Sequence, residues 1–119
     1  TQTAPRSPCA SLVAESVALA GAGAMDAAER GLMAARALCP AEAAPLRELA
    51  GLRFLQSRWA EAINLATAAL ERDAGDRNAR ETLATSLYLT GEVERALDVW
   101  APLGAPRIDV VSVQGADRT

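Results

Sequence analysis

Cys9 and Cys39 are the only cysteines of this 119-residue chain, and they are its clearest candidates for covalent chemistry. They do not form the Cys-x-x-Cys pair that catalytic dithiols use, so we expect no redox catalysis. Two cysteines alone do not indicate a cellular compartment. Whether they can bond to each other depends on the elements that carry them.

Other catalytic chemistry finds no support in the residue types. The sequence contains no histidine, which excludes His-based catalysis and His metal ligation. We find no pair of carboxylates suited to acid–base catalysis and no nucleophile beside a base. The run 21–24 contains two glycines but lacks the preceding strand that a dinucleotide-binding motif requires. We therefore expect a protein that is not an enzyme, with no metal and no cofactor.

Charge and hydropathy limit the partners. All 12 basic residues are arginine and the net charge is −3, whereas nucleic-acid binding needs a basic face. The longest charge-free apolar stretch near the start, residues 16–25, is shorter than the roughly 20 residues of a membrane-spanning helix. We expect neither a nucleic-acid partner nor direct membrane insertion.

The composition predicts one domain built from helices. Half of the residues are apolar, and alanine supplies close to half of these. Alanine is the strongest helix former and fills strands poorly. Only four residues are aromatic, which also argues against a β-sandwich or barrel.

The elements repeat with a period of 34 residues. Ala28, Ala62 and Ala96 are related by this offset, and the register runs without a gap through the units 9–42, 43–76 and 77–110. We expect these alanines to be fully buried in one hydrophobic cluster that is continuous across all helices. The same offset relates three small residues that each lie between two helical patterns: Gly23, Ser57 and Gly91.

Apolar spacing and helix breakers predict six helices. Ser7, Ser57 and Asp76 are the expected N-caps of the first, fourth and fifth helices. Glu61 and Arg95 fall on faces that we expect to point to solvent. The predicted ranges are 8–20, 26–38, 42–56, 59–72, 77–89 and 92–100.

The pattern resembles the tetratricopeptide repeat (TPR) family, in which two helices of each 34-residue unit cross at small residues. The matching small positions on the first helices are Ser16, Ala50 and Ala84. The chain departs from the family at the fourth position of each unit, where Leu12, Leu46 and Arg80 replace an aromatic residue. The resemblance implies an all-α fold over residues 9–102: a right-handed α-solenoid of three antiparallel helix pairs.

Antiparallel helices would bring the start of the first helix beside the end of the second, where Cys9 and Cys39 lie. We expect a disulfide there, which indicates export to the periplasm or the exterior. The alternative is two reduced cysteines used as small core residues, in a cytoplasmic protein.

The resemblance also implies a concave groove lined by the first helix of each unit, which would bind a protein or peptide segment by apolar anchors. Only Arg47 could bind an acidic tail in this groove, so a clamp for acidic C-termini is not expected. The groove residues are Ala10, Val13, Val17, Ala20, Arg47, Gly51, Phe54, Leu55, Asn78, Glu81, Thr85, Tyr88 and Leu89.

Two large residues are expected to have structural roles. We expect Trp59 and Trp100 to fill gaps between units. No helix follows Trp100, so we also expect it to be an exposed docking point, through which a homodimer could form.

The sequence of residues 103–119 predicts a linker followed by an extended segment. Residues 108–113 are β-branched and predict a strand, which is not stable alone. The strand either docks on the last helices or begins a following domain that is cut off at Thr119, and we favour the second. Residues 107–119 resemble the opening strand of POTRA domains, the periplasmic repeats that precede outer-membrane β-barrels of the barrel-assembly family.

Three hypotheses for function follow. The first is a protein-interaction scaffold that binds a partner through the concave face or the C-terminal end, as the exported N-terminal module of a larger bacterial envelope protein. The second is a structural spacer whose groove is empty. The third is the non-catalytic part of an enzyme that is completed beyond residue 119.

Overall fold

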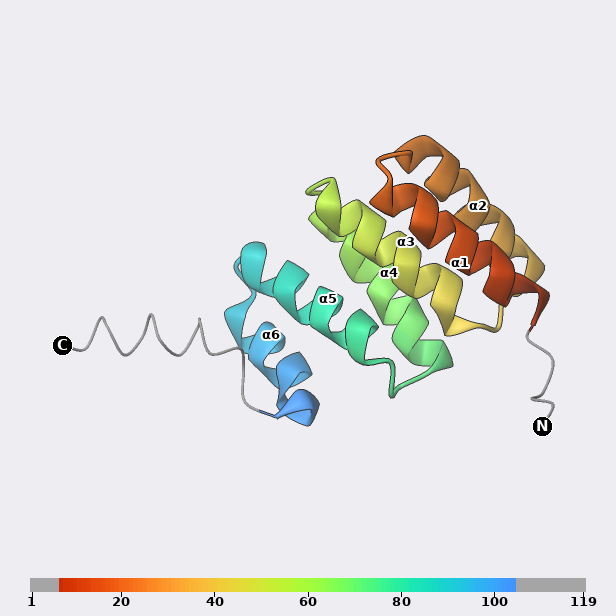
Figure 1. The fold of residues 1–119 in the computed structure, drawn as a ribbon. Helices are drawn as coiled ribbons and strands as arrows, with labels where there is room; N and C mark the ends of the chain where they lie inside the picture. The colour runs from red at the N-terminus through yellow and green to blue at the C-terminus, as the bar shows by residue number, and fades with distance from the viewer. Residues whose placement is uncertain (1–6, 105–119) are drawn as a thin grey trace.

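The computed structural model describes residues 7–104, which form six α-helices and one short 3₁₀ helix and contain no strand (Figure 1). The all-α prediction is confirmed, and each predicted helix boundary lies within one residue of the observed one. The predicted strand at 108–113 lies outside the described residues. The elements are α1 (Pro8–Gly21), α2 (Met25–Leu38), α3 (Ala43–Leu55), α4 (Trp59–Arg72), α5 (Arg77–Leu89), α6 (Val93–Trp100) and η1 (Ala101–Leu103).

Two of the three predicted caps are confirmed. The backbone N–H of Ala10 donates to Ser7 Oγ at 3.2 Å, and that of Ala79 donates to Asp76 Oδ1 at 3.0 Å. These bonds satisfy donors that a helix start leaves without an intrahelical partner.

The prediction that Ser57 caps α4 is wrong. Arg58 stands at the cap position without a side-chain bond, and Ser57 has a left-handed backbone with φ of 61°. Gly23 and Gly91, at the equivalent positions, have φ of 89° and 91°. Each turn between the two helices of a unit therefore needs a left-handed residue here, which glycine adopts most easily and serine adopts at a cost.

The helices pack in chain order, each against the next (Figure 1). Helix α3 also contacts α1 and α5, so that α1, α3 and α5 form a layer, and α2, α4 and α6 each pack against a helix of this layer. This layer is the one that carries the predicted groove residues.

Small side chains lie where paired helices cross. Ala28, Ala62 and Ala96 have no exposed surface, as predicted. Ser16 of α1 is 1 % exposed, and a Cβ atom added to Gly31 of α2 would collide with its hydroxyl. The backbones therefore approach too closely for larger residues at these points.

The core is divided into three clusters of buried residues, in contrast to the single cluster that we expected. Half-buried Leu65 of α4 packs against all three. The three clusters share no buried residue, so Leu65, which contacts each of them, joins them.

Trp100 is 4 % exposed, so the prediction of an exposed docking point is wrong. Its ring lies in the cluster formed with α3, α4 and α5, with its centroid 6.1 Å from that of Tyr88. Trp59 is half-buried and meets Phe54 edge-on, with a centroid distance of 5.2 Å. Each tryptophan packs against an aromatic residue of an earlier helix: Trp59 against Phe54 of α3, and Trp100 against Tyr88 of α5.

Candidate functional site

A pocket of about 320 Å³ opens between α1 and α3. Leu32 of α2 and Leu52 of α3 are among its lining residues and are buried. Its size is at the lower end for sites that bind small ligands, and it suits one or two apolar side chains. The other lining residues are Val17, Ala20, Glu48, Gly51, Phe54 and Leu55.

Five of these residues belong to the predicted groove: Val17, Ala20, Gly51, Phe54 and Leu55. Gly51 has no atom within 4 Å of the place where a Cβ would stand, so its missing side chain leaves the pocket open. The Phe54 ring also meets Trp59, which is not among the lining residues, edge-on. Val17 is 43 % exposed and Leu55 is 69 % exposed, so both can meet a partner.

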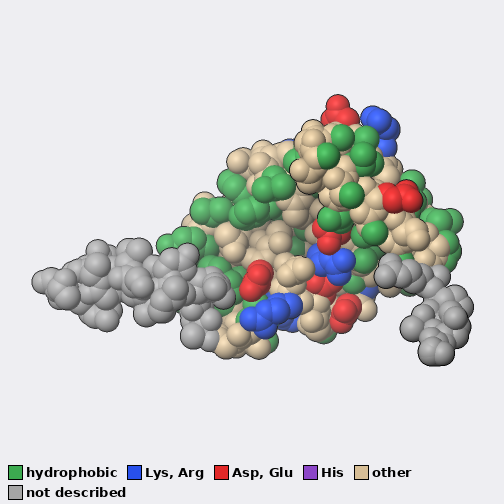
Figure 2. All heavy atoms as spheres, in the orientation of Figure 1, with side chains coloured by type: hydrophobic (Ala, Val, Ile, Leu, Met, Phe, Trp, Pro, Cys, Tyr) green, Lys and Arg blue, Asp and Glu red, His purple; other side chains and the backbone are tan. Residues whose placement is uncertain are grey.

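The surface around the pocket is apolar toward the ends of α3 and α5. On the face seen in Figure 2, hydrophobic side chains gather there, while charged side chains lie nearer the starts of these helices. Tyr88 and Leu89, at the end of α5, are 40 % and 49 % exposed. They belong to the predicted groove but do not line the pocket.

Arg47 is held by two carboxylates. Its Nε atom pairs with Glu48 at 2.9 Å, and its Nη1 atom pairs with Asp76 at 3.1 Å. These carboxylates raise the pKa of Arg47, against the opposing effect of its partial burial. Because Asp76 also caps α5, Arg47 links the start of α3 to the start of α5.

The remaining predicted groove residues are divided between surface and core. Val13 is 7 % exposed and packs in the cluster with Leu32 and Leu49, so it does not line a groove. It lies one helical turn before Val17 on α1, where the helix meets the core. Asn78 is exposed, Ala10, Glu81 and Thr85 are half-buried, and Glu81 forms a 3.9 Å ion pair with Arg77.

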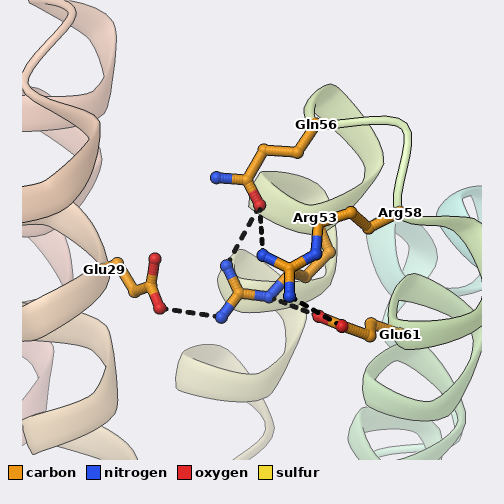
Figure 3. A network of polar contacts seen from close by, with 5 residues as sticks. All are labelled: Glu29, Arg53, Gln56, Arg58 and Glu61. Carbon is orange, nitrogen blue, oxygen red and sulfur yellow. Dashed lines mark hydrogen bonds and ion pairs between the residues drawn. The ribbon is translucent and has the colours of Figure 1, made fainter.

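An ionic network joins α2, α3 and α4 (Figure 3). Arg53, whose side chain is 11 % exposed, donates from Nη2 to Glu29 at 2.8 Å and pairs through Nε with Glu61 at 2.9 Å. Glu61 also pairs with Arg58 at 2.7 Å, and Gln56 accepts from Arg53 at 3.1 Å.

This network was not predicted from the sequence. Glu61 is exposed, as predicted, with 47 % of its side chain accessible, whereas Arg53 was not among the predicted site residues. A signal was present, since an arginine in the apolar pattern of α3 needs partners when it is buried.

Arg53 and Glu29 stabilise each other's charged forms. The hydrogen bond from Arg53 lowers the pKa of Glu29 below its ordinary value of 4.5. The same bond raises the pKa of Arg53.

Cys9 and Cys39 form the predicted disulfide, with 6.4 Å between their Cα atoms. Cys9 is fully buried in the first turn of α1, and Cys39 is half-buried at the end of α2. Glu42, which directly precedes α3, lies beside them and accepts a 3.2 Å hydrogen bond from the Ser7 hydroxyl. The ligand atoms of the three residues Cys9, Cys39 and Glu42 lie within 4.8 Å of one another.

Across residues 7–104, none of the helices combines the length and the apolar character needed to cross a bilayer. No protein-family model matches the chain, and a search of curated proteins finds no match.

Proposed function

We propose that residues 9–102 form a TPR-type right-handed solenoid of three antiparallel helix pairs. The 34-residue period recurs in backbone conformation, because Gly23, Ser57 and Gly91 are all left-handed. It also recurs in burial at both helix crossings. On the second helices the buried residues are Ala28, Ala62 and Ala96, and on the first they are Ser16, Ala50 and Ala84.

The solenoid acts as a protein-interaction module whose binding face is the layer of α1, α3 and α5. The pocket between α1 and α3 carries this proposal, because its walls are apolar while its rim residues Val17 and Leu55 are exposed. A partner segment inserts one apolar side chain into the pocket and lies across Leu55. Burial of such an anchor supplies most of the affinity in interfaces of this kind.

The module functions after export. The disulfide supports this location, since such bonds persist mainly in oxidising compartments. A homodimer through Trp100 is not part of the proposal, because the indole is buried.

Selection of a random peptide library on the immobilised oxidised chain tests the function. We expect enrichment of peptides with a large apolar residue, since the pocket is apolar and holds about 320 Å³. Leu55→Arg then weakens their binding about tenfold or more, the loss typical of a central anchor contact. Isothermal titration calorimetry of the enriched peptides measures the change.

Leu38→Arg is the matched control, because Leu38 is 59 % exposed at the end of α2 and does not line the pocket. Its affinity for the peptides should equal that of the unmodified chain. If Leu55→Arg bound the enriched peptides as tightly as the unmodified chain does, the proposed site would be wrong. A selection that enriches nothing would favour the structural spacer instead.

A further inference from the structure

We propose that the chain binds Zn²⁺ through Cys9, Cys39 and Glu42 when its disulfide is reduced. No metal is expected from the sequence, and the proposed peptide-binding face does not use these residues. The inference rests on a convergence of three helix ends. Cys9 begins α1, Cys39 follows the end of α2, and Glu42 precedes α3.

The spacing of the donor atoms fits a tetrahedral zinc site. Zinc–sulfur bonds of about 2.3 Å place two thiolate sulfurs about 3.8 Å apart in a tetrahedron. The Cα atoms of Cys9 and Cys39 are 6.4 Å apart, so side-chain rotation alone can provide this separation after reduction. The Glu42 carboxylate lies within 4.8 Å of both sulfurs and supplies the third ligand. Water completes the coordination.

Several features of the surroundings offset the cost of negative charge on Cys9, which is fully buried among apolar side chains. Cys9 lies in the first turn of α1, where the helix dipole stabilises an anionic sulfur. Within residues 7–104, Glu42 has no arginine partner that would compete with a metal ion. The Ser7 hydroxyl donates to one Glu42 oxygen and leaves the other for the metal. Such outer hydrogen bonds orient the ligands of zinc sites.

The chemistry balances with a dithiol reductant. The reductant transfers two electrons and two protons to the disulfide, giving two thiols at Cys9 and Cys39, and is itself oxidised to a disulfide. Zn²⁺ then replaces the two thiol protons, which pass to solvent. The disulfide joins α1 to α2, whereas the metal would also hold α3 through Glu42.

The test uses the full chain, reduced with a phosphine under anaerobic conditions and titrated with Co²⁺ as a spectroscopic probe for Zn²⁺. We expect thiolate-to-cobalt charge-transfer absorption that saturates at one metal per chain. Zn²⁺ should displace the cobalt, and about two protons should be released per metal bound. The oxidised chain should give no such absorption, because its sulfurs are bonded to each other.

Variants separate the roles of the donors. Cys39→Ser should abolish the charge-transfer band of a two-thiolate site. Glu42→Gln should weaken binding about tenfold or more, since loss even of groups outside the ligand shell has effects of this size. Glu15→Gln is the matched control on α1, because Glu15 is exposed and lies outside the cluster. Its affinity should be unchanged.

Absence of the thiolate band in the reduced chain would overturn the proposal, and so would equal affinity in Glu42→Gln and the unmodified chain. Circular dichroism covers the case in which the reduced chain unfolds without metal. A gain of helicity on adding Zn²⁺, absent in Cys39→Ser, then supports the site. Helicity that does not respond to Zn²⁺ in an unfolded reduced chain excludes it.

Discussion

Ser16 and Gly31 meet where α1 crosses α2, and the contact leaves no room for a side chain at Gly31. The Ser16 hydroxyl donates to the backbone oxygen of Leu12 at 2.8 Å, so it can turn away only by losing that bond. At the scale of single residues, the spacing between α1 and α2 therefore depends on the absence of a side chain at Gly31 as well as on the position of the Ser16 hydroxyl.

Gly31→Ala should destabilise the protein by about 1–3 kcal/mol, the range for overpacking a close contact. Helix propensity alone would favour alanine by about 1 kcal/mol, so the sign of the change shows which effect dominates. Urea unfolding of the oxidised chain measures it. Gly51→Ala is the control, because a Cβ there meets nothing within 4 Å, and it should be stabilising. Stabilisation by both substitutions would contradict the close crossing.

Arg53 acts at the scale of elements, because one guanidinium on α3 bonds to Glu29 on α2 and to Glu61 on α4. Neighbouring helix pairs of a repeat stack must be held in register. Between the first two pairs, this network adds directional contacts to an interior that is largely alanine.

Arg53→Ala should lower the free energy of unfolding by about 1–2 kcal/mol, the value for charged hydrogen bonds after screening by water. Screening matters because the side chains of Glu29 and Glu61 are 35 % and 47 % exposed. Arg58→Ala removes an exposed pair to the same Glu61 and should cost less than about 1 kcal/mol. Urea unfolding of the two variants provides the comparison, and equal losses would show that Arg53 does not link the helices.

The pH dependence follows from the lowered pKa of Glu29. The unfolded chain binds a proton at Glu29 more readily than the folded chain, so this stabilisation is present above about pH 4.5 and is lost as the pH falls through the folded-state pKa. Glu29→Gln should therefore be less stable than the unmodified protein at neutral pH, and the gap should close in acid. Thermal unfolding at a series of pH values tests this, and a gap that widens in acid would contradict it.

Much of this element-scale structure follows from local sequence. The helix bounds agree to within one residue because glycines, prolines and capping side chains mark the ends, and because alanine-rich segments have one strong preference. The conformation of Ser57 was missed, since serine before a helix usually indicates a cap. Only its equivalence to Gly23 and Gly91 could have indicated a left-handed residue.

Residues of the candidate site could be predicted only where the 34-residue period shows that their side chains share the face formed by α1, α3 and α5. Val17, Phe54 and Leu55 were found in this way, since each lies on the layer of first helices. Val13 was wrongly included because residues four apart share a helix face, and the period does not show which of them a neighbouring helix covers; Val13 is 7 % exposed and Val17 is 43 % exposed. The place of Arg53 in an apolar pattern indicates that it needs partners, but local sequence does not identify them, because they come from two other helices.

At the scale of the whole described chain, residues 7–104, the helices pack in chain order, and one covalent link, Cys9–Cys39, joins the first two. Its sulfurs join residues 30 positions apart, which limits the conformations open to the unfolded chain.

Replacing both cysteines by alanine should destabilise the protein by about 3–4 kcal/mol in the chain-entropy description for a loop of this length. Urea unfolding of the oxidised chain and of the Cys9→Ala, Cys39→Ala double variant, both with a chelator present, measures the difference. The reduced chain in chelator should be close to the double variant. Equal stability of oxidised and double-variant chains would show that the link does not stabilise the fold.

The disulfide also makes the two ends of the helix series differ in stability, because it crosslinks only the first two helices. Helix α6 has eight residues and packs mainly on α5 and η1, whereas the opposite end is fastened covalently. Under a stretching force the chain should therefore peel from α6 toward α1. The crosslinked hairpin at the other end would open last and would serve as the seed on which the later helices reassemble.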